Sequence, residues 1–137
     1  MNTRNEEIAQ KFLSYANQND LEAMIRLLSD DFEFISPSGR AYDEEKLFQN
    51  LPRTYERIPD HHTEIIRTIS QDDSVVVVTN RKGTLVRGYY FCVEARNKSF
   101  ELPFINIFDF DSGLIKRWET CFNVQLLQES QNKLNHN

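Results

Sequence analysis

The residue with the clearest chemical potential in this sequence is Asn106, an amide set into an apolar row. Within residues 99–110, every second position from Phe100 onward is apolar except Asn106. Strand side chains alternate between the two faces, so the amide shares one face with phenylalanine and leucine side chains. Burying an amide without a hydrogen-bond partner costs about 1–3 kcal/mol. Asn106 therefore either bonds to a neighbouring element or lines a cavity and donates to a ligand, and the sequence leaves both open.

Few other side chains have a spacing suited to chemistry. Ser36 precedes Pro37, a position more typical of a turn-capping hydroxyl than of a nucleophile. His61 and His62 are adjacent at the entrance of a predicted strand, and no third metal ligand has a suitable spacing. We expect a solvated histidine pair, with no metal and no cofactor.

Three helices are predicted to position these residues. A capping box at residues 3–6 opens the first helix, which carries Phe12 and Tyr15 on its apolar face. A short second helix follows. The third helix begins near Asp43 and turns Tyr55 inward.

Strands dominate the rest of the chain. One strand, at residues 32–36, precedes the third helix, and a bulge is expected near Gly83 and Gly88. In the last strand, Leu114 and Trp118 are placed on comparable sides. Helices first and strands afterwards indicate an α+β fold with helices on one face of a curved sheet. The other predicted strands are residues 62–69, 75–78, 89–96, 99–110 and 114–122.

Length and charge limit the classes of function. The 137 residues are predicted to form one domain, with a core at about residues 6–123 and a polar tail at 124–137. A net charge of −5 without a long Lys/Arg cluster argues against nucleic-acid and membrane partners. Cys92 and Cys121 are expected to be reduced, half-buried thiols. The sequence shows no apolar run of transmembrane length and no signal-peptide pattern, so we expect a soluble, cytoplasmic protein.

Four stretches, in this order, resemble the family of small cone-shaped α+β proteins that includes ketosteroid isomerase, SnoaL-like polyketide cyclases and nuclear transport factor 2. They are N-D-L at residues 19–21, D-D-F-E-F-I-S-P-S-G at 30–39, F-I-N-I-F-D-F at 104–110 and D-S-G-L-I-K-R-W at 111–118. The resemblance covers nearly the whole chain. It implies a cone-shaped barrel, in which a curved, mainly antiparallel sheet packs against three N-terminal helices. This fold hosts many unrelated activities, so it specifies no reaction.

The resemblance also implies a cavity inside the cone, open beside the helices. Asn106 and Tyr15 are the candidate catalytic side chains in it. A mostly apolar wall with few polar groups is the usual form of a small-molecule site. The predicted pocket-lining residues are Phe12, Phe34, Ser36, Tyr55, Phe104, Phe108, Trp118, Thr120 and Phe122.

The catalytic acids of the family do not carry over to this sequence. The base of ketosteroid isomerase corresponds to Ser36, its oxyanion tyrosine to Phe12 and its protonated aspartate to Asn106, so one hydrogen-bond donor survives. The last aspartate of the related epoxide hydrolases falls on Thr120. The acid that many cyclases carry four or five residues after the tryptophan falls on Phe122 or Asn123.

These observations predict a small-molecule-binding protein with an apolar pocket and an unidentified apolar ligand. For an enzyme, we expect isomerase, cyclase or lyase chemistry on an apolar carbonyl compound, with Asn106 polarising the oxygen. The base would have to come from Tyr15, His62 or Glu64.

The alternative is a non-catalytic protein-interaction module. The family resemblance implies a homodimer through the open face of the sheet. Apolar side chains that point outward would supply the contact area. The side chains expected to do so are Ile105, Ile107, Ile115 and Cys121.

Overall fold

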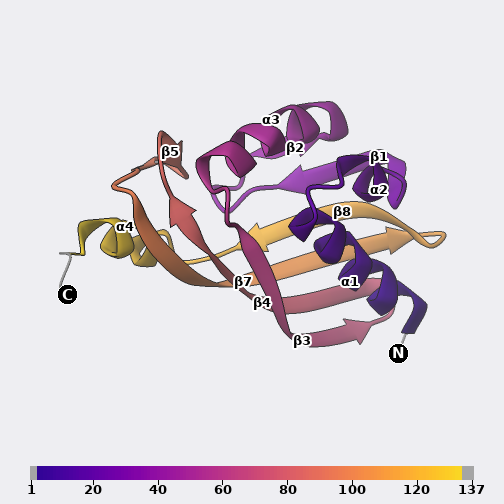
Figure 1. Cartoon of the computed structure of the whole chain (residues 1–137). Helices are drawn as coiled ribbons and strands as arrows, with labels where there is room; N and C mark the ends of the chain where they lie inside the picture. Colours follow the sequence, from indigo (N-terminus) through magenta and orange to yellow (C-terminus); the bar gives the residue numbers. More distant parts are fainter. Residues whose placement is uncertain (1–2, 134–137) are drawn as a thin grey trace.

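The frame of the molecule is a curved six-stranded sheet with helices on one face (Figure 1). The computed structural model describes residues 3–133. The strand order is β2-β1-β8-β7-β4-β3, and all neighbouring pairs are antiparallel except β1 and β8. The predicted α+β class and cone-like sheet curvature are confirmed, and the sheet is open, with β2 and β3 at its edges. Its strands are β1 (Leu28–Ile35), β2 (Ala41–Asp43), β3 (His62–Gln71), β4 (Ser74–Leu85), β7 (Lys98–Asp111) and β8 (Leu114–Cys121).

The pairing of β7 with β4 is the longest in the sheet. The predicted inward row of β7 is buried throughout, and Asn106 within it is only 3% exposed. β4 is much longer than the predicted strand at residues 75–78, because its pairing with β7 continues through Thr79 and Arg81. The register also runs through Gly83 without the predicted bulge.

Three helices pack on the inner face of the sheet near the predicted positions, but the second is shorter than expected, because β1 begins at Leu28 rather than at residue 32. Asp20 and Asp43 begin the second and third of them as N-caps, accepting from the N–H groups of Ala23 at 3.1 Å and Lys46 at 2.8 Å. Pro52 lies inside the third helix without ending it. The helices are α1 (Thr3–Asn17), α2 (Leu21–Ile25) and α3 (Glu44–Arg57).

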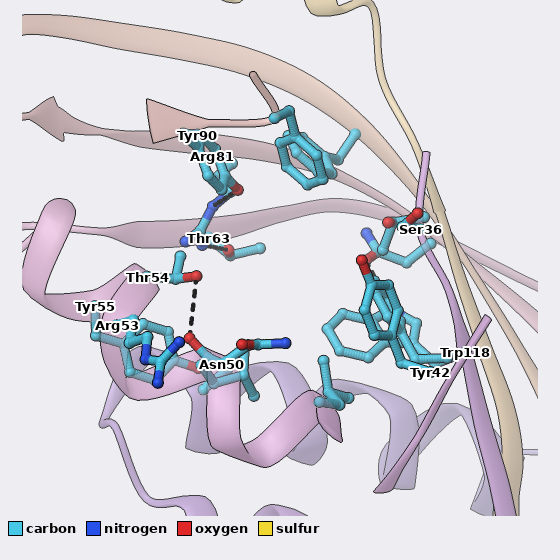
Figure 2. A pocket seen from close by; sticks show the side chains of 18 of the residues that line it. Ser36, Tyr42, Asn50, Arg53, Thr54, Tyr55, Thr63, Arg81, Tyr90 and Trp118 are labelled. Atoms are coloured by element: carbon cyan, nitrogen blue, oxygen red, sulfur yellow. Dashed lines mark hydrogen bonds between the residues drawn. The ribbon is translucent and has the colours of Figure 1, made fainter. Parts of the chain in front are cut away.

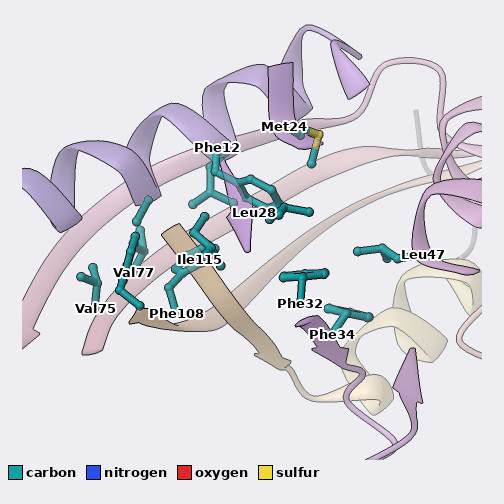
Figure 3. Close-up of a cluster of buried hydrophobic side chains, with 13 residues drawn as sticks. Phe12, Met24, Leu28, Phe32, Phe34, Leu47, Val75, Val77, Phe108 and Ile115 are labelled. Atoms are coloured by element: carbon teal, nitrogen blue, oxygen red, sulfur yellow. The ribbon is translucent and has the colours of Figure 1, made fainter. Parts of the chain in front are cut away.

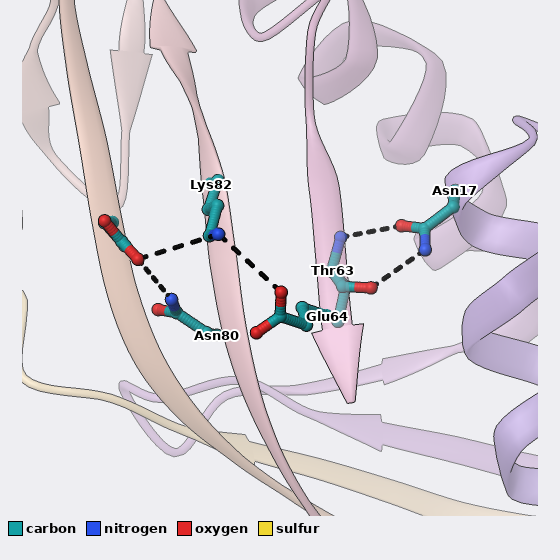
Figure 4. A network of polar contacts seen from close by, with 6 residues as sticks. Asn17, Thr63, Glu64, Asn80 and Lys82 are labelled. Atoms are coloured by element: carbon teal, nitrogen blue, oxygen red, sulfur yellow. Dashed lines mark hydrogen bonds and ion pairs between the residues drawn. The ribbon is translucent and has the colours of Figure 1, made fainter. Parts of the chain in front are cut away.

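One side chain fixes the end of α1 to the edge strand β3. Nδ2 of Asn17 donates to the carbonyl oxygen of Thr63 at 2.9 Å, and the N–H of Thr63 donates to Oδ1 of Asn17 at 2.7 Å (Figure 4). The amide thus takes the place of a neighbouring strand at this edge. Lys82 pairs nearby with Glu64 at 3.7 Å and Glu101 at 3.8 Å, and such exposed ion pairs contribute little to stability.

Two apolar clusters fill the space between the sheet and the helices. The larger lies beneath α1 and α2, and its fully buried side chains include Phe12, Met24, Phe108 and Ile115 (Figure 3). Burial of side chains of this size stabilises the fold by roughly 1.5–3 kcal/mol each. The smaller cluster consists of Ile58, Leu85, Val93, Phe100, Leu102, Phe104 and Leu127.

Residues 124–132 of the predicted polar tail, for which partial helix at best was expected, form the complete helix α4 (Val124–Asn132). Leu127 anchors this helix because it is fully buried in the smaller cluster. The side chain of Gln131 accepts from the N–H of Arg96 at 3.0 Å and donates to the carbonyl oxygen of Lys98 at 3.1 Å. Residues 134–137 of the predicted tail lie outside the described residues.

The prediction of a single strand at residues 89–96 is wrong, because the chain folds back on itself there. Phe91 and Cys92 form the turn with φ angles of +48° and +65°. Such angles cost residues other than glycine about 1–2 kcal/mol each. The ring of Phe91 offsets part of this cost by packing on Phe122, with centroids 4.9 Å apart. The resulting hairpin consists of β5 (Tyr89–Tyr90) and β6 (Val93–Glu94).

A bulge reverses the expected alternation at the start of β8. Asp109 of β7 pairs with Arg117 but the next residue pairs with Ile115, so Lys116 is the extra residue. Ile115 therefore points inward and is fully buried, whereas Leu114 is 39% exposed. The predictions that Ile115 faces outward and that Leu114 shares a side with Trp118 are wrong.

The structure also bears on the predicted state of the cysteines and on the search for membrane-spanning segments. Cys92 and Cys121 are free thiols, but both are exposed rather than half-buried. Within residues 3–133, no helix is long and apolar enough to cross a membrane.

Gly83 allows the end of α3 to dock on the sheet. A Cβ atom at this position would collide with Cγ2 of Ile58, which is fully buried, and would lie 3.3 Å from the ring of Phe100. Ile58 follows α3 directly, so the close approach at Gly83 sets how near that helix lies to β4. The absent side chain is therefore a packing requirement rather than a need for an unusual backbone angle.

We expect Gly83→Ala to lower the free energy of unfolding by about 1–3 kcal/mol, because the added methyl group overpacks the contact with Ile58. Urea denaturation measures the change. Ser99→Ala on the neighbouring strand, where the side chain is exposed, should stay within about 0.5 kcal/mol of the parent. Equal stability of the Gly83 variant and the parent would contradict this account of α3 docking.

Candidate functional site

A cavity of about 360 Å³ opens between the inner face of the sheet, α3 and the β5–β6 hairpin (Figure 2). Small-molecule sites typically enclose about 300–1,000 Å³. Strands β4, β7 and β8 form its floor, and α3 forms one wall. The polar and aromatic side chains that line it include Ser36, Tyr42, Asn50, Arg53, Thr54, Tyr55, Arg57, Thr63, Thr79, Arg81, Tyr90, Asn106, Trp118 and Thr120.

Asn106 is the centre of a hydrogen-bonded network on the cavity floor. Its Oδ1 accepts from Nε1 of Trp118 at 3.2 Å. Its Nδ2 donates to Oγ1 of Thr79 at 3.0 Å and to the carbonyl oxygen of Val77 at 3.2 Å. Both N–H groups and the oxygen of the amide therefore have partners within the protein. Asn106 lines the cavity, but in this arrangement it has no free donor with which to polarise a ligand carbonyl.

Thr120 carries the unpaired polar atom of the floor. It pairs with Asn106 across β7 and β8 and is only 4% exposed. Within the described part of the chain, its Oγ1 has no hydrogen-bond partner, although the side chain lines the cavity. Leaving a buried hydroxyl without a partner costs about 1–3 kcal/mol. This hydroxyl is therefore the polar group of the floor that is left without a hydrogen-bond partner among the described residues.

Trp118 forms an aromatic end of the cavity. Its ring packs against Phe34, with centroids 4.7 Å apart. Phe12 and Phe108 support it from behind, at 5.1 Å and 6.0 Å, and both are fully buried. Phe12 and Phe108 were expected to line the cavity, but they are separated from it by the indole ring and belong to the core.

The remaining predicted site residues divide between the cavity and its surroundings. Seven of the predicted site residues line the cavity: Phe34, Ser36, Tyr55, Phe104, Asn106, Trp118 and Thr120. Phe122 is withdrawn from it, because its ring stacks on Phe104 at 4.5 Å and also contacts Phe91. Tyr15 packs against the larger cluster and is not among the described lining residues.

Ser36 has the turn-capping role that its position before Pro37 predicted. Its Oγ accepts from the N–H of Arg40 at 3.3 Å and lies 2.9 Å from the hydroxyl of Ser38. The side chain is buried, so these local bonds satisfy a hydroxyl that would otherwise be unpaired. No described contact activates it as a nucleophile.

Tyr55 and His61 form a stacked pair beside the cavity, with ring centroids 4.2 Å apart and planes 4° from parallel. Burial raises the pKa of Tyr55 to about 12, although the positive charge of Arg81 acts in the opposite direction. Burial, with help from Arg81 and His62, lowers the pKa of His61 to about 4. Tyr55 is therefore a neutral hydrogen-bond donor near pH 7, and His61 is a neutral imidazole.

The other proposed bases lie outside the cavity. His62 and Glu64 are exposed, and the ion pair of Glu64 with Lys82 is on the protein surface. The prediction of a solvated histidine pair holds for His62 but is wrong for His61, which is 7% exposed. Among the described residues that line the cavity, none is aspartate, glutamate or histidine. No group of three or more metal-ligating side chains occurs in the described part of the chain.

Sequence reasoning missed Thr79 and the three arginines of the cavity. Thr79 and Arg81 continue the inward alternation of Val77 along β4, so extending the period-two pattern would have placed both. Arg53 and Arg57 are four residues apart in α3 and therefore share a face of that helix. Their spacing could have placed both arginines on one face of α3. The sequence did not indicate that this face packs over the sheet and lines the cavity.

Comparison with known proteins adds a family and a fold. A family model described as a SnoaL-like domain matches residues 9–118. No curated protein matches the chain.

Three solved structures illustrate the shared fold. A provisionally named SnoaL-like polyketide cyclase from Jannaschia sp. CCS1 has a TM-score of 0.85 at 15% identity, covering 97% of this chain and 94% of that chain. AclR, a provisionally named hydroxylase from Streptomyces galilaeus, has a TM-score of 0.79 at 16% identity, covering 96% and 97%. An NTF2-like protein of unknown function from Burkholderia pseudomallei K96243 has a TM-score of 0.79 at 14% identity, covering 96% and 100%. At these identities the likeness shows the fold alone.

The buried imidazole of His61 makes stability depend on pH. Its pKa falls from an ordinary 6.5 to about 4 on folding, so the unfolded chain binds the extra proton more readily. We expect the free energy of unfolding to be highest above pH 6.5 and to fall as the pH drops towards 4, with His61 contributing at most about 3 kcal/mol. Urea denaturation at a series of pH values measures this slope.

His61→Phe keeps a ring for stacking on Tyr55 and should flatten the slope, since the titrating group is gone. His62→Gln, at the exposed neighbour, is the matched control and should keep most of it. Identical slopes for the parent and His61→Phe would show that His61 is not the group responsible.

Proposed function

We propose that this chain, which belongs to the SnoaL-like domain family, binds a small, largely apolar molecule in the cavity beneath α3. The observation that carries the proposal is the unpaired hydroxyl of Thr120, buried on an otherwise satisfied floor. Native proteins rarely leave a buried polar atom without a partner, so the hydroxyl of Thr120 needs an explanation, and a ligand would provide one. A bound ligand oxygen or nitrogen would supply the missing bond.

The aromatic end of the cavity supports the same function. The faces of Trp118 and Phe34 offer flat apolar area, and Tyr42 lies 6.0 Å from Phe34. A planar molecule gains from stacking on such rings as well as from leaving water. Structural relatives described as a polyketide cyclase and a hydroxylase are consistent with an organic small molecule as ligand.

Binding is supported better than proton-transfer catalysis. A general base near neutral pH needs a carboxylate, an imidazole or a similarly tuned group within reach of the substrate. The described cavity-lining residues include no carboxylate or histidine, and the pKa of Tyr55 is about 12. Isomerase, cyclase or lyase chemistry with Asn106 as the donor is not part of this proposal, because both N–H groups of that amide already have acceptors in the protein.

Trp118, the only tryptophan in the sequence, provides the test. We would titrate the protein with planar bicyclic phenols, ketones and carboxylic acids while following indole fluorescence, and would measure the affinities by calorimetry. We expect saturable quenching by at least one compound and about five- to tenfold weaker binding of it by Thr120→Val, the loss of one hydrogen bond. No quenching by any compound, with the protein folded, would contradict the proposal.

Thr79→Val is the matched control, because it removes the same hydroxyl from a side chain that has partners. Without ligand, we expect Thr120→Val to be as stable as the parent or more stable, since no hydrogen bond is lost. Thr79→Val should lose about 1–3 kcal/mol, because it deprives the Asn106 amide of an acceptor. If the Thr120 hydroxyl serves a ligand, Thr120→Val should therefore keep the stability of the parent while Thr79→Val loses stability.

A second candidate function, a dimeric interaction module, is favoured by the outer face of the sheet. Outward side chains form two neighbouring apolar rows across the strands, while α1, α2 and α3 lie on the other face (Figure 1). Arg67 extends one row at the β3 edge and Glu119 the other on β8. A two-fold axis along the strands would bring these opposite charges together, so a second copy fits the face. The rows contain Ile69, Val76 and Ile107, and Val78, Ile105 and Cys121.

We expect sedimentation velocity to show a dimer that Ile105→Glu converts to monomer, because it buries a charge in the apolar rows. Ile105 is 38% exposed in the single chain. Leu126→Glu, at a 39% exposed leucine on α4, is the control and should leave the dimer intact. A parent protein that sediments as a monomer at micromolar concentration would exclude this function.

A further inference from the structure

The charges that line the cavity are of one sign. Arg53, Arg57 and Arg81 all contribute to its lining, and none of its described lining residues is acidic. The whole chain, by contrast, has a net charge of −5. A concave site with positive walls in an acidic protein attracts anions and raises their local concentration. From this arrangement we propose that the ligand is an organic carboxylate with a planar apolar body, a step that rests on the small-molecule-binding function proposed above.

Arg81 is the residue placed to hold the carboxylate. Its Nε donates to the hydroxyl of Tyr90 at 3.1 Å, and Nη1 donates to Oγ1 of Thr63 at 3.1 Å. These bonds fix the direction of the guanidinium, but both partners are neutral. Within residues 3–133, no carboxylate lies within ion-pair distance of it. Its remaining N–H groups, including both on Nη2, are available for a bidentate bond to a carboxylate.

An oriented, half-buried guanidinium without a counter-ion is unfavourable in the empty protein. Removing a cation from water costs free energy that an opposite charge must offset. Elsewhere in the chain, exposed arginines such as Arg26 and Arg96 do have acidic partners, at 3.6 Å and 3.1 Å. Within the described part of the chain, Arg81 has no such partner, and a bound carboxylate would supply one.

The surroundings of Arg81 agree with a positive, donor-rich end of the cavity. Arg57 is held beside the hairpin, where its Nη1 donates to the carbonyl oxygen of Tyr89 at 3.0 Å. Tyr55 keeps its proton and remains a donor, since its pKa is about 12. The charge of Arg81 also contributes to the low pKa of His61, so that imidazole is neutral near pH 7.

The two ends of the cavity differ in chemistry, and this sets the shape of the ligand. Figure 2 shows Arg81, Tyr90 and Thr63 gathered at one end and Trp118 with Tyr42 at the other. An anionic head at the arginine end would leave a flat apolar body against the indole. The hydroxyl of Thr120 would then meet a polar atom on that body rather than the carboxylate.

The test compares two probes of the same shape, 2-naphthoate and 2-naphthamide, which differ in charge. We expect calorimetry at pH 7.5 to show at least about tenfold tighter binding of the acid, the scale of one charge-assisted hydrogen-bonded pair. Raising the salt concentration should weaken binding of the acid and leave the amide nearly unchanged, because salt screens only the charged interaction. This second comparison needs no variant, so it holds even where a substitution perturbs folding.

Arg81→Gln should remove most of the preference for the acid while changing amide binding less than about twofold. Arg26→Gln makes the same change at an exposed arginine on the surface and should leave both affinities as they are. A role of Arg81 limited to holding Tyr90 and the hairpin would instead weaken both probes equally.

Each outcome separates the two proposals. Equal binding of acid and amide by the parent protein overturns the carboxylate inference and leaves the small-molecule function supported. Binding of neither probe by the folded protein, together with a failed fluorescence titration, overturns both. A preference for the acid that survives in Arg81→Gln overturns the assignment of Arg81.

Discussion

The burial of the Asn106 amide in the inner row of β7 is the constraint on which the site depends. An amide in a phenylalanine-rich layer must be paired, and its partners come from both neighbouring strands, Thr79 on β4 and Trp118 on β8. The three central strands are therefore held in one register by a buried polar contact as well as by backbone bonds. Both N–H groups of the amide are then used, and the neighbouring hydroxyl of Thr120 is left without a partner in residues 3–133.

The second requirement is the close approach of α3 to the sheet. Gly83 admits Ile58, and the helix that ends there carries Tyr55 and Arg57 over the inner face of β4. Arg81 meets them from the strand side. The same approach that closes the smaller core thus partly shields Arg57, Arg81 and Tyr55 from water, and electrostatic interactions are stronger where water is partly excluded. Packing and site chemistry are set by one contact.

Local patterns in the sequence predicted the parts of this arrangement that depend on periodicity. The inward row of β7, the helical faces of α1 and α3 and the curved α+β frame follow from periods of two and 3.6. The patterns could not predict the pairing register of the strands or how far each inward side chain lies from the cavity. Ile115 points inward because one extra residue, Lys116, shifts the pairing of β8. Phe12 faces inward as predicted, but the indole of Trp118 packs between it and the cavity. That contact depends on tertiary structure and not on local periodicity.

Three positions that correspond, by the family resemblance, to the catalytic groups of ketosteroid isomerase have structural roles in this chain. Ser36 caps a turn, Phe12 supports the indole, and Asn106 joins three strands. The polar groups left to meet a ligand lie on other elements, and those with exchangeable protons, Arg81, Tyr55 and Thr120, can all donate. Donors stabilise negative charge, whereas removal of a proton from carbon needs an acceptor of suitable pKa. The lining of this cavity therefore agrees better with the anion binding proposed above than with proton transfer, and such differences in lining let one fold host unrelated activities.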